Sequence, residues 1–241
     1  MELQGKVALV TGAAVRVGRA IALGLAREGA RVALHYHRSA SEAAATQTEL
    51  EALGAEAARF QANLAKVREI QELARSVHTH FGRIDVLVNN AAIYYPTPFG
   101  QTTEEQWDRL LDINLRAPFF CSQYVAEHMR EGKIVNIADV AGLSPWPGYL
   151  PYSCSKAGLI ALTRGLAKAL APAIQVNAIA SGTVLLQEDA SEEYAENIKQ
   201  LSLLKRIGSP EDIVNTVLYL LKGTDFITGE VIAVDGGRHL L

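Results

Sequence analysis

Short apolar runs return along the whole chain and alternate with longer stretches that have helical spacing. Each run holds four to six residues, mostly Val, Ile, Leu and Ala, which is typical of strands buried on both faces of a parallel sheet. Strict alternation of such strands with helices predicts a doubly wound α/β sheet with helices on both faces. The expected strands are 6–10, 31–36, 55–60, 84–89, 133–138, 174–179 and 230–234, and the expected helices are 17–28, 40–53, 66–80, 103–129, 150–170 and 209–222.

Two of these helices begin with clear capping signals. Thr102-Thr-Glu-Glu105 has the pattern of a capping box, and Ser209 is followed by a proline and two acidic residues in the first turn. No composition break, low-complexity tract or repeat interrupts the 241 residues. We therefore expect a single domain, 1–241.

Composition narrows the classes of function. The chain is 49% hydrophobic and 20% charged, which suits a buried core, and its net charge of -3 suits neither nucleic acid nor an anionic membrane. No apolar run is long enough to cross a bilayer, and Met1 leads directly into the first strand without a signal segment. Cys121 and Cys154 have no metal-binding spacing. We expect a cytoplasmic protein that binds no metal, nucleic acid or membrane.

The strongest candidate for catalysis is the pair Tyr152 and Lys156, with Asp139 thirteen residues before the tyrosine. Residues at i and i+4 lie on the same side of a helix, so the ammonium can lie near the phenol. A nearby positive charge lowers the pKa of a phenol and prepares it for proton transfer. Alone, the pair is equally compatible with a tyrosine and a lysine on the surface of an ordinary helix.

The loop after the first strand has features of a phosphate-binding turn. Gly12 permits close approach of the backbone, and Gly18 lets the next helix lie near the sheet with its N-terminal N–H groups directed at an anion. Arg16 replaces the middle glycine expected of a dinucleotide loop. A loop of this kind can also be only a turn, but the basic end of the second strand favours nucleotide binding.

The end of the second strand predicts the identity of the nucleotide. An NAD enzyme needs a carboxylate there to accept from the ribose 2′-hydroxyl, whereas this chain has His37, Arg38 and Ser39, with no acid before Glu42. An imidazole, a guanidinium and a hydroxyl suit a 2′-phosphate. We therefore expect these residues to select NADPH. The alternative is that they belong to a solvated loop with ordinary charges and bind no phosphate.

Five motifs occur in the order found in one large family: the Thr11-Gly12 loop, Asn89-Asn-Ala91, Asn114, Tyr152-x-x-x-Lys156 and Val234-Asp-Gly-Gly237. The chain thus resembles the short-chain dehydrogenase/reductases along nearly its whole length. The resemblance implies a Rossmann-type fold, Tyr152 as proton donor, Lys156 on the nicotinamide ribose, Asn114 anchoring a water and assembly as a homotetramer. The cofactor contacts it implies are Gly12, Arg16, Val17, Gly18, His37, Arg38, Ser39, Asn63, Leu64, Asn90, Ala91, Tyr152, Lys156 and Gly182.

Departures from the general pattern resemble the pteridine reductases within that family. Asp139 stands where most members have Ser, Arg16 where they have Gly, and Tyr94 precedes Tyr-Pro-Thr-Pro. The resemblance implies a small pterin-type substrate, with Asp139, Tyr152 and Lys156 as the catalytic set, Arg16 facing both cofactor phosphate and pterin, and Tyr94 stacking on the pterin. Three positions depart from this subgroup or from the wider family: Ala92, Asn63 and Ser181.

The chemistry of Asp139 can be argued separately. A fixed carboxylate repels the negative oxygen that forms when a ketone is reduced, unless the carboxyl is protonated. Reduction of a C=N bond tolerates a carboxyl group better, because the basic heterocycle can carry positive charge. This favours a pterin or dihydropterin reductase. Two alternatives stay open: a carbonyl reductase such as a 3-oxoacyl-thioester reductase, in which Asp139 is a structural cap, and a non-catalytic NADPH-binding sensor.

The segment 183–201 follows a glycine-led turn and is rich in acidic residues. We expect it to form a lid over the substrate. The acidic residues can select neutral or cationic substrates, and they are equally compatible with a solvated helix face.

Overall fold

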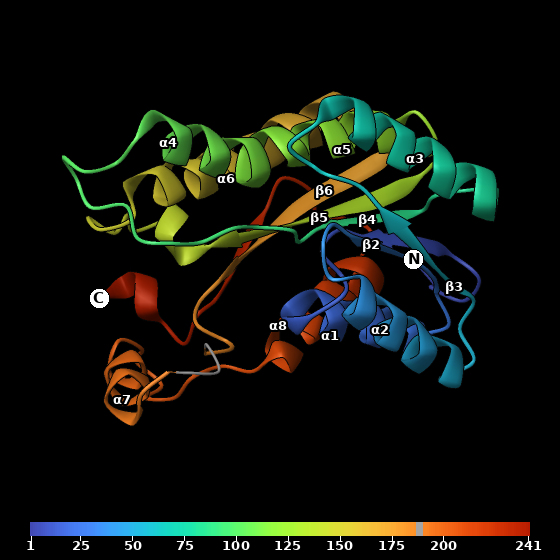
Figure 1. Ribbon diagram of the computed structural model, residues 1–241. Helices are drawn as coiled ribbons and strands as arrows, with labels where there is room; N and C mark the ends of the chain where they lie inside the picture. Colours follow the sequence, from blue (N-terminus) through green and yellow to red (C-terminus); the bar gives the residue numbers. More distant parts are fainter. Residues whose placement is uncertain (187–189) are drawn as a thin grey trace.

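A parallel sheet of seven strands forms the centre of the computed structural model (Figure 1). Its strand order is β3-β2-β1-β4-β5-β6-β7, so the chain moves outward from β1 in one direction and then from β4 in the other. The strands are β1 (Val7–Val10), β2 (Arg31–Tyr36), β3 (Ala57–Gln61), β4 (Val86–Asn89), β5 (Gly132–Asp139), β6 (Ile174–Ser181) and β7 (Val231–Val234).

The predicted doubly wound sheet is confirmed: all seven expected strands are present, and no strand end differs from its expected position by more than two residues. The structure describes residues 1–186 and 190–241. Every residue of β1 is buried, and in register Val10 pairs with Leu34 on one side and Val88 on the other. Burial on both faces explains why the central strands are apolar throughout instead of alternating.

Helices cover both faces of the sheet. Figure 1 shows α1 (Arg16–Arg27), α2 (Ala40–Ala52) and α8 (Pro210–Leu218) on one face, and α3 (Val67–Phe81), α5 (Ala117–Ala126) and α6 (Leu150–Leu170) on the other. Helices α1 and α8 approach closely, because Gly24 presents no side chain: a Cβ there would lie 2.4 Å from Val214 Cγ1. The two apolar layers thus formed fix the sheet and hold its carboxyl edge in one shape.

The prediction of a single helix at 103–129 is wrong in its detail. This stretch of the chain comprises α4 (Glu104–Leu111), a π-helical segment (Asp112–Arg116) and α5. Its N-cap is Thr103 with Gln106 as the reciprocal partner, one residue later than the Thr102–Glu105 box predicted from the sequence. Glutamine completes the same pair of bonds as glutamate, so the sequence offers two overlapping boxes. The cap at Ser209 is confirmed, with Asp212 as its partner.

The segment expected to form a lid contains α7 (Glu192–Gln200), which the sequence-based assignment of helices omitted. Its residues 187–189 lie outside the described residues, while 183–186 and 190–201 can be placed. Figure 1 shows α7 and the C-terminal 3₁₀ turn (Arg238–Leu240) beyond the body of the sheet, on the side of its carboxyl edge. Over the described parts of the chain, no helix combines the length and the apolar character required to cross a membrane.

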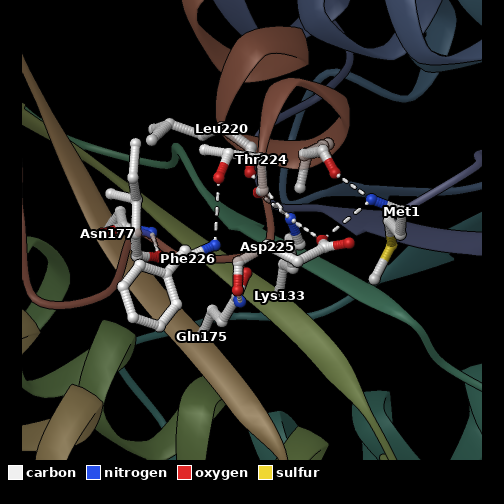
Figure 2. Close-up of polar contacts among 10 residues, drawn as sticks. Met1, Lys133, Gln175, Asn177, Leu220, Thr224, Asp225 and Phe226 are labelled. Atoms are coloured by element: carbon white, nitrogen blue, oxygen red, sulfur yellow. Dashed lines mark hydrogen bonds and ion pairs between the residues drawn. The ribbon is translucent and has the colours of Figure 1, made fainter.

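A polar cluster lies at the start of β5 (Figure 2). Lys133 is buried, and its Nζ donates to the carbonyl oxygens of Leu220 at 3.2 Å and Thr224 at 2.8 Å while pairing with Asp225 Oδ1 at 2.7 Å. The ammonium of Met1 donates to the same Asp225 oxygen at 3.1 Å and to Leu221 O at 2.8 Å. The cluster joins the chain start, β5 and the connection between α8 and β7.

Candidate active site

Asp139, Tyr152 and Lys156 meet at the carboxyl end of β5. A 3₁₀ turn (Val140–Gly142) after β5 returns the chain to α6, so the tyrosine approaches the aspartate from the helix. The Tyr152 hydroxyl donates to Asp139 Oδ2 at 2.9 Å, and the Ala141 N–H donates to Asp139 Oδ1 at 2.8 Å. Lys156 is buried on the same side of α6, and its Nζ donates to Ile137 O at 2.8 Å.

Burial dominates the electrostatics of these three groups. Loss of solvation raises the pKa of Asp139, against the opposing effects of the Ala141 N–H, Lys156, Tyr152 and Arg238. Burial also lowers the pKa of Lys156 to about 8, with the Asp139 charge acting in the other direction. The pKa of Tyr152 is raised well above its ordinary value by burial and by the negative charge of Asp139. Burial, and after it the negative charge of Asp139, therefore move the phenol pKa in the direction opposite to the one expected from the lysine.

Asn114 lies in the π-helical segment and connects two parts of the site. Its Oδ1 accepts from the Ile93 N–H at 2.9 Å, and its Nδ2 donates to Ile93 O at 2.9 Å and to Ser155 Oγ at 3.3 Å. The side chain thus holds the loop after β4 against α6. The π-helical geometry adds one residue to the turn and is common at functional sites.

The loop between β1 and α1 has the close packing expected of a phosphate-binding turn. Gly12 has a φ of 64°, and a Cβ on Gly18 would lie 2.1 Å from Gly12 O and 2.5 Å from Asn90 Nδ2. Arg16 also has a positive φ, 54°. Only glycine adopts this conformation without cost, so the arginine there introduces backbone strain of about 1 kcal/mol.

His35 and Asn90 hold this loop in place. The Gly12 N–H donates to His35 Nδ1 at 3.0 Å, and His35 Nε2 lies 3.0 Å from Ala62 O, so the neutral tautomer with a proton on Nε2 satisfies both contacts. Burial lowers the pKa of His35 to about 4. Asn90 Nδ2 donates to the carbonyl oxygens of Thr11 at 2.9 Å and Gly12 at 3.2 Å. Sequence reasoning missed His35, whose only signal is a histidine inside an apolar strand.

The residues expected at the 2′-phosphate lie together. His37, Arg38 and Ser39 line a cavity of about 840 Å³ after β2, and Asn63 lines it from the end of β3. The Asn63 Oδ1 accepts from the Ala65 N–H at 3.0 Å, so this oxygen already has a partner in its own loop. The opposite side of the cavity carries charged residues of α4 and the π-helical segment, including Glu104, Glu105, Asp108, Arg109 and Asp112.

The other predicted cofactor residues lie along the same edge. Val17, Leu64 and Ala91 line a second cleft with Gly12, Gly18 and Asn90. Gly182 follows β6, where a Cβ would lie 2.7 Å from the Asp235 Cα. Ser181, in place of the family's proline, pairs with Asp139 in register, and its Oγ donates to Ala138 O at 3.4 Å.

A cavity of about 850 Å³ opens beside Asp139 and Tyr152. Arg16 and Tyr94 line it, as the sequence predicts for the substrate site, together with Ala92. Gly182 also lines it, and so do residues of the expected lid: Thr183, Val184, Leu185, Leu186, Ala190 and Tyr194.

Four aromatic residues form one side of this cavity, here called the aromatic wall: Tyr94, Trp146, Tyr149 and Tyr152. Tyr94 stacks on Tyr149 with ring centroids 4.7 Å apart and an interplanar angle of 5°. The centroid of the Tyr94 ring lies 5.0 Å from that of Tyr152, with an interplanar angle of 71°. The centroid of the Trp146 ring lies 6.5 Å from that of Tyr152, with an interplanar angle of 28°. Trp146 and Tyr149 are not among the site residues predicted from the sequence.

Two arginines connect the cavity to its surroundings. Arg16 Nη2 donates to the carbonyl oxygens of Leu185 and Leu186, each at 3.2 Å, and so joins the β1–α1 loop to the segment after β6. Arg238, from the C-terminal turn, places its Cζ 4.5 Å from the centre of the Trp146 ring and donates to Thr183 Oγ1 at 3.2 Å. The sequence gives no signal for Arg238, since its position depends on the return of the chain after β7.

Known proteins match this chain over nearly its whole length. A protein-family model described as enoyl-(acyl carrier protein) reductase matches residues 12–239. The 3-oxoacyl-(acyl-carrier-protein) reductase of Staphylococcus epidermidis is 40% identical over 246 residues, covering 98% of this chain and 99% of the relative.

Solved structures are similar over the same length. A double mutant of the Serratia marcescens short-chain dehydrogenase/reductase is 36% identical, with a TM-score of 0.94 over 99% of this chain and 100% of that one. A blue fluorescent protein from a metagenomic library, solved in complex with NADPH, is 33% identical, with a TM-score of 0.92 over 99% of each chain.

These comparisons correct the expected substrate. The interpretation as a pteridine reductase acting on a C=N bond is wrong, since relatives at 39 to 41% identity over nearly the full length are 3-oxoacyl-(acyl-carrier-protein) reductases. They match the carbonyl-reductase alternative. The argument from Asp139 assumed a charged carboxylate, whereas burial raises the pKa of this group and weakens that assumption. The chain is an oxidoreductase and belongs to the short-chain dehydrogenase/reductase family.

Proposed function

We propose that this protein is an NADPH-dependent reductase that converts the 3-keto group of an acyl thioester to a hydroxyl group. The observation that carries the proposal is the contact between Tyr152 and Asp139 beside Lys156, at the edge where the cofactor clefts meet the 850 Å³ cavity. The names of the full-length relatives support the choice of substrate.

The residues of the cleft fit NADPH. The packed glycines of the β1–α1 loop leave room for a pyrophosphate at the N-terminus of α1. His37, Arg38 and Ser39 offer positive charge and donors to a 2′-phosphate, and no carboxylate ends β2 to select a free hydroxyl. The bound cofactor supplies a hydride for the carbonyl carbon. The structure of an NADPH complex of a relative with the same fold supports the fit.

Tyr152 delivers the proton to the carbonyl oxygen. Its raised pKa keeps the phenol protonated at neutral pH, and its hydroxyl already lies at the cavity. Asp139 is a second donor to the developing oxyanion when it is protonated, a state that burial favours. Lys156, with its pKa lowered to about 8, is the positive charge nearest to this pair on α6. Asn114 fixes the loop that carries Tyr94 relative to this helix.

The segment 183–201 acts as the lid in this proposal, since six of its described residues line the cavity: Thr183, Val184, Leu185, Leu186, Ala190 and Tyr194. We further propose a homotetramer, as the family resemblance implies. Light scattering of the purified protein tests the assembly, and a monomer would contradict it.

Turnover of an acetoacetyl thioester tests the proposed function. We expect NADPH oxidation with acetoacetyl-N-acetylcysteamine, a slower reaction with NADH, and a loss of at least about 100-fold in kcat for Tyr152→Phe. Tyr124→Phe, which removes a hydroxyl from α5 away from the cavity, is the matched control. NADPH binding without reduction of any 3-oxoacyl thioester would overturn the proposal.

A further inference from the structure

The aromatic wall is a more specialised surface than reduction of a saturated 3-oxoacyl chain requires. A small aliphatic chain needs only apolar contact, which any combination of leucine and valine supplies. Here four aromatic rings line one side of a cavity, and each lies within 6.5 Å of at least two others. Tyr94 is 42% exposed, so it remains accessible to a ligand in the cavity.

The wall is held in place by contacts from three directions. Tyr149 is the N-cap residue of α6, and the Thr97 N–H donates to the neighbouring Gly148 O at 2.9 Å. The backbone N–H of Trp146 donates to Ser153 Oγ at 3.2 Å, and the Arg238 guanidinium lies over the Trp146 ring. A surface fixed before the ligand arrives loses little conformational entropy on binding.

We propose that the aromatic wall is a specificity-determining subsite for a planar aromatic substituent on the ketone side of the substrate. The wall adjoins the Tyr152 hydroxyl, so a ketone held there places the substituent next to the rings of Tyr94, Trp146 and Tyr149. Aromatic pairs contribute in stacked or edge-on geometries beyond the area they bury. This inference rests on the proposed carbonyl reduction and names the class of substrate: 3-aryl-3-oxoacyl thioesters.

Two thioesters of equal size test the subsite. 3-Oxo-3-phenylpropanoyl-N-acetylcysteamine carries a flat ring, and 3-cyclohexyl-3-oxopropanoyl-N-acetylcysteamine carries a puckered ring with the same number of carbons. The two ketones differ in intrinsic reactivity, so the quantity to compare is the phenyl-to-cyclohexyl ratio of kcat/KM in each variant. The intrinsic difference is the same for every variant and cancels.

We expect this ratio to fall about fivefold in Trp146→Leu and in Tyr149→Leu relative to the unchanged protein. Tyr94→Leu provides a third variant that is less prone to misfold, because this side chain is half exposed. Phe99→Leu is the matched control, since it removes an aromatic ring that is 86% exposed and outside the cavity. Its ratio should equal that of the unchanged protein.

The two proposals fail in distinguishable ways. If the unchanged protein reduces both thioesters and the ratio stays the same in all three wall variants, the subsite is wrong while carbonyl reduction stands. If the unchanged protein reduces neither thioester, nor the acetoacetyl thioester, the proposed function itself is wrong.

Discussion

Charge and burial oppose each other at individual residues of this site. Lys156 is buried and Asp139 is partly buried, and each would lose its charge more readily without the other nearby. The Asp139 charge raises the pKa of Lys156, while burial lowers it to about 8. Each charge therefore shifts the pKa of the other group toward its charged form.

Substitution of Asp139 should reveal this coupling. In Asp139→Asn the charge that raises the pKa of Lys156 is lost, so that pKa should fall below about 8. The pH dependence of kcat/KM for NADPH reports ionisations of the free enzyme, and we expect its limb near pH 8 to move to lower pH. Glu131→Gln, which removes an exposed carboxylate before β5, away from the clefts and the cavity, should leave the limb in place. An unmoved limb in Asp139→Asn would contradict the coupling.

His35 gives a second prediction at this scale. Its folded-state pKa of about 4 lies below the ordinary value of 6.5, so the unfolded chain binds a proton at this residue more readily than the folded protein does. The contribution of neutral His35 to the free energy of unfolding is therefore fully present above pH 6.5 and is lost as the pH falls towards 4. That loss amounts to about 3 kcal/mol. In His35→Leu the Gly12 N–H and Ala62 C=O lose their partner, at a cost of about 3 kcal/mol at neutral pH.

Urea unfolding at about pH 7.5 and about pH 5 measures both effects of His35. The unchanged protein should lose stability between these pH values, and His35→Leu should show a smaller change. His37→Leu, which removes an exposed imidazole whose charge is the smallest of the three influences on the pKa of His35, is the control for loss of a histidine. Parallel pH dependence in His35→Leu and the unchanged protein would show that another group titrates.

Sequence reasoning located some of these residues and not others for a physical reason. Tyr152 and Lys156 lie on one helix, so their spacing alone places them together, and Asp139 ends a recognisable strand. Arg238 and Trp146 meet only after the chain has folded, and no local pattern encodes that contact. The raised pKa of Tyr152 also depends on burial, which the sequence does not measure.

Among the elements, the strands could be predicted because each is a short apolar run. The interruption of the helix expected at 103–129 could not be predicted. The π-helical turn at Asp112–Arg116 is set by the contacts of Asn114 with Ile93 and Ser155, which are distant in sequence. Helix periodicity reports the face that is buried, and the short segments on either side of this turn hold too few repeats to show that one residue has been added.

The first turn of α1 provides the prediction at this scale. In Gly18→Ala the added Cβ would lie 2.1 Å from Gly12 O, so the β1–α1 loop must move. We expect a loss of about 1–3 kcal/mol in stability and at least a tenfold weaker affinity for NADPH, measured by fluorescence titration. Gly148→Ala is the matched control, because a Cβ there meets no atom within 4 Å. Unchanged NADPH affinity in Gly18→Ala would argue against this loop as the phosphate site.

Across the whole molecule, the two ends of the strands have different roles. The carboxyl edge carries the clefts and the cavity, while at the start of β5 the buried Lys133 joins distant segments of the chain (Figure 2). The separation predicts that stability and activity can be changed independently.

Lys133→Met tests this separation. The carbonyl oxygens of Leu220 and Thr224 lose a charged donor, so we expect the free energy of unfolding to fall by about 1–3 kcal/mol. The kcat for an acetoacetyl thioester should stay unchanged at a temperature where both proteins are folded. Lys168→Met, which removes an exposed ammonium from α6, should affect neither quantity. A large fall in kcat for Lys133→Met would show that the two edges are coupled.

The position of Arg16 has a consequence for how such an enzyme can be altered. One side chain, on a backbone that would suit glycine, hydrogen-bonds to two consecutive peptide oxygens of the segment across the cleft. Any replacement too short to reach these oxygens loses both hydrogen bonds to that segment. Because Arg16 lines both the coenzyme cleft and the cavity, a mutation of this codon alters the affinity for the coenzyme and the access of the ketone together.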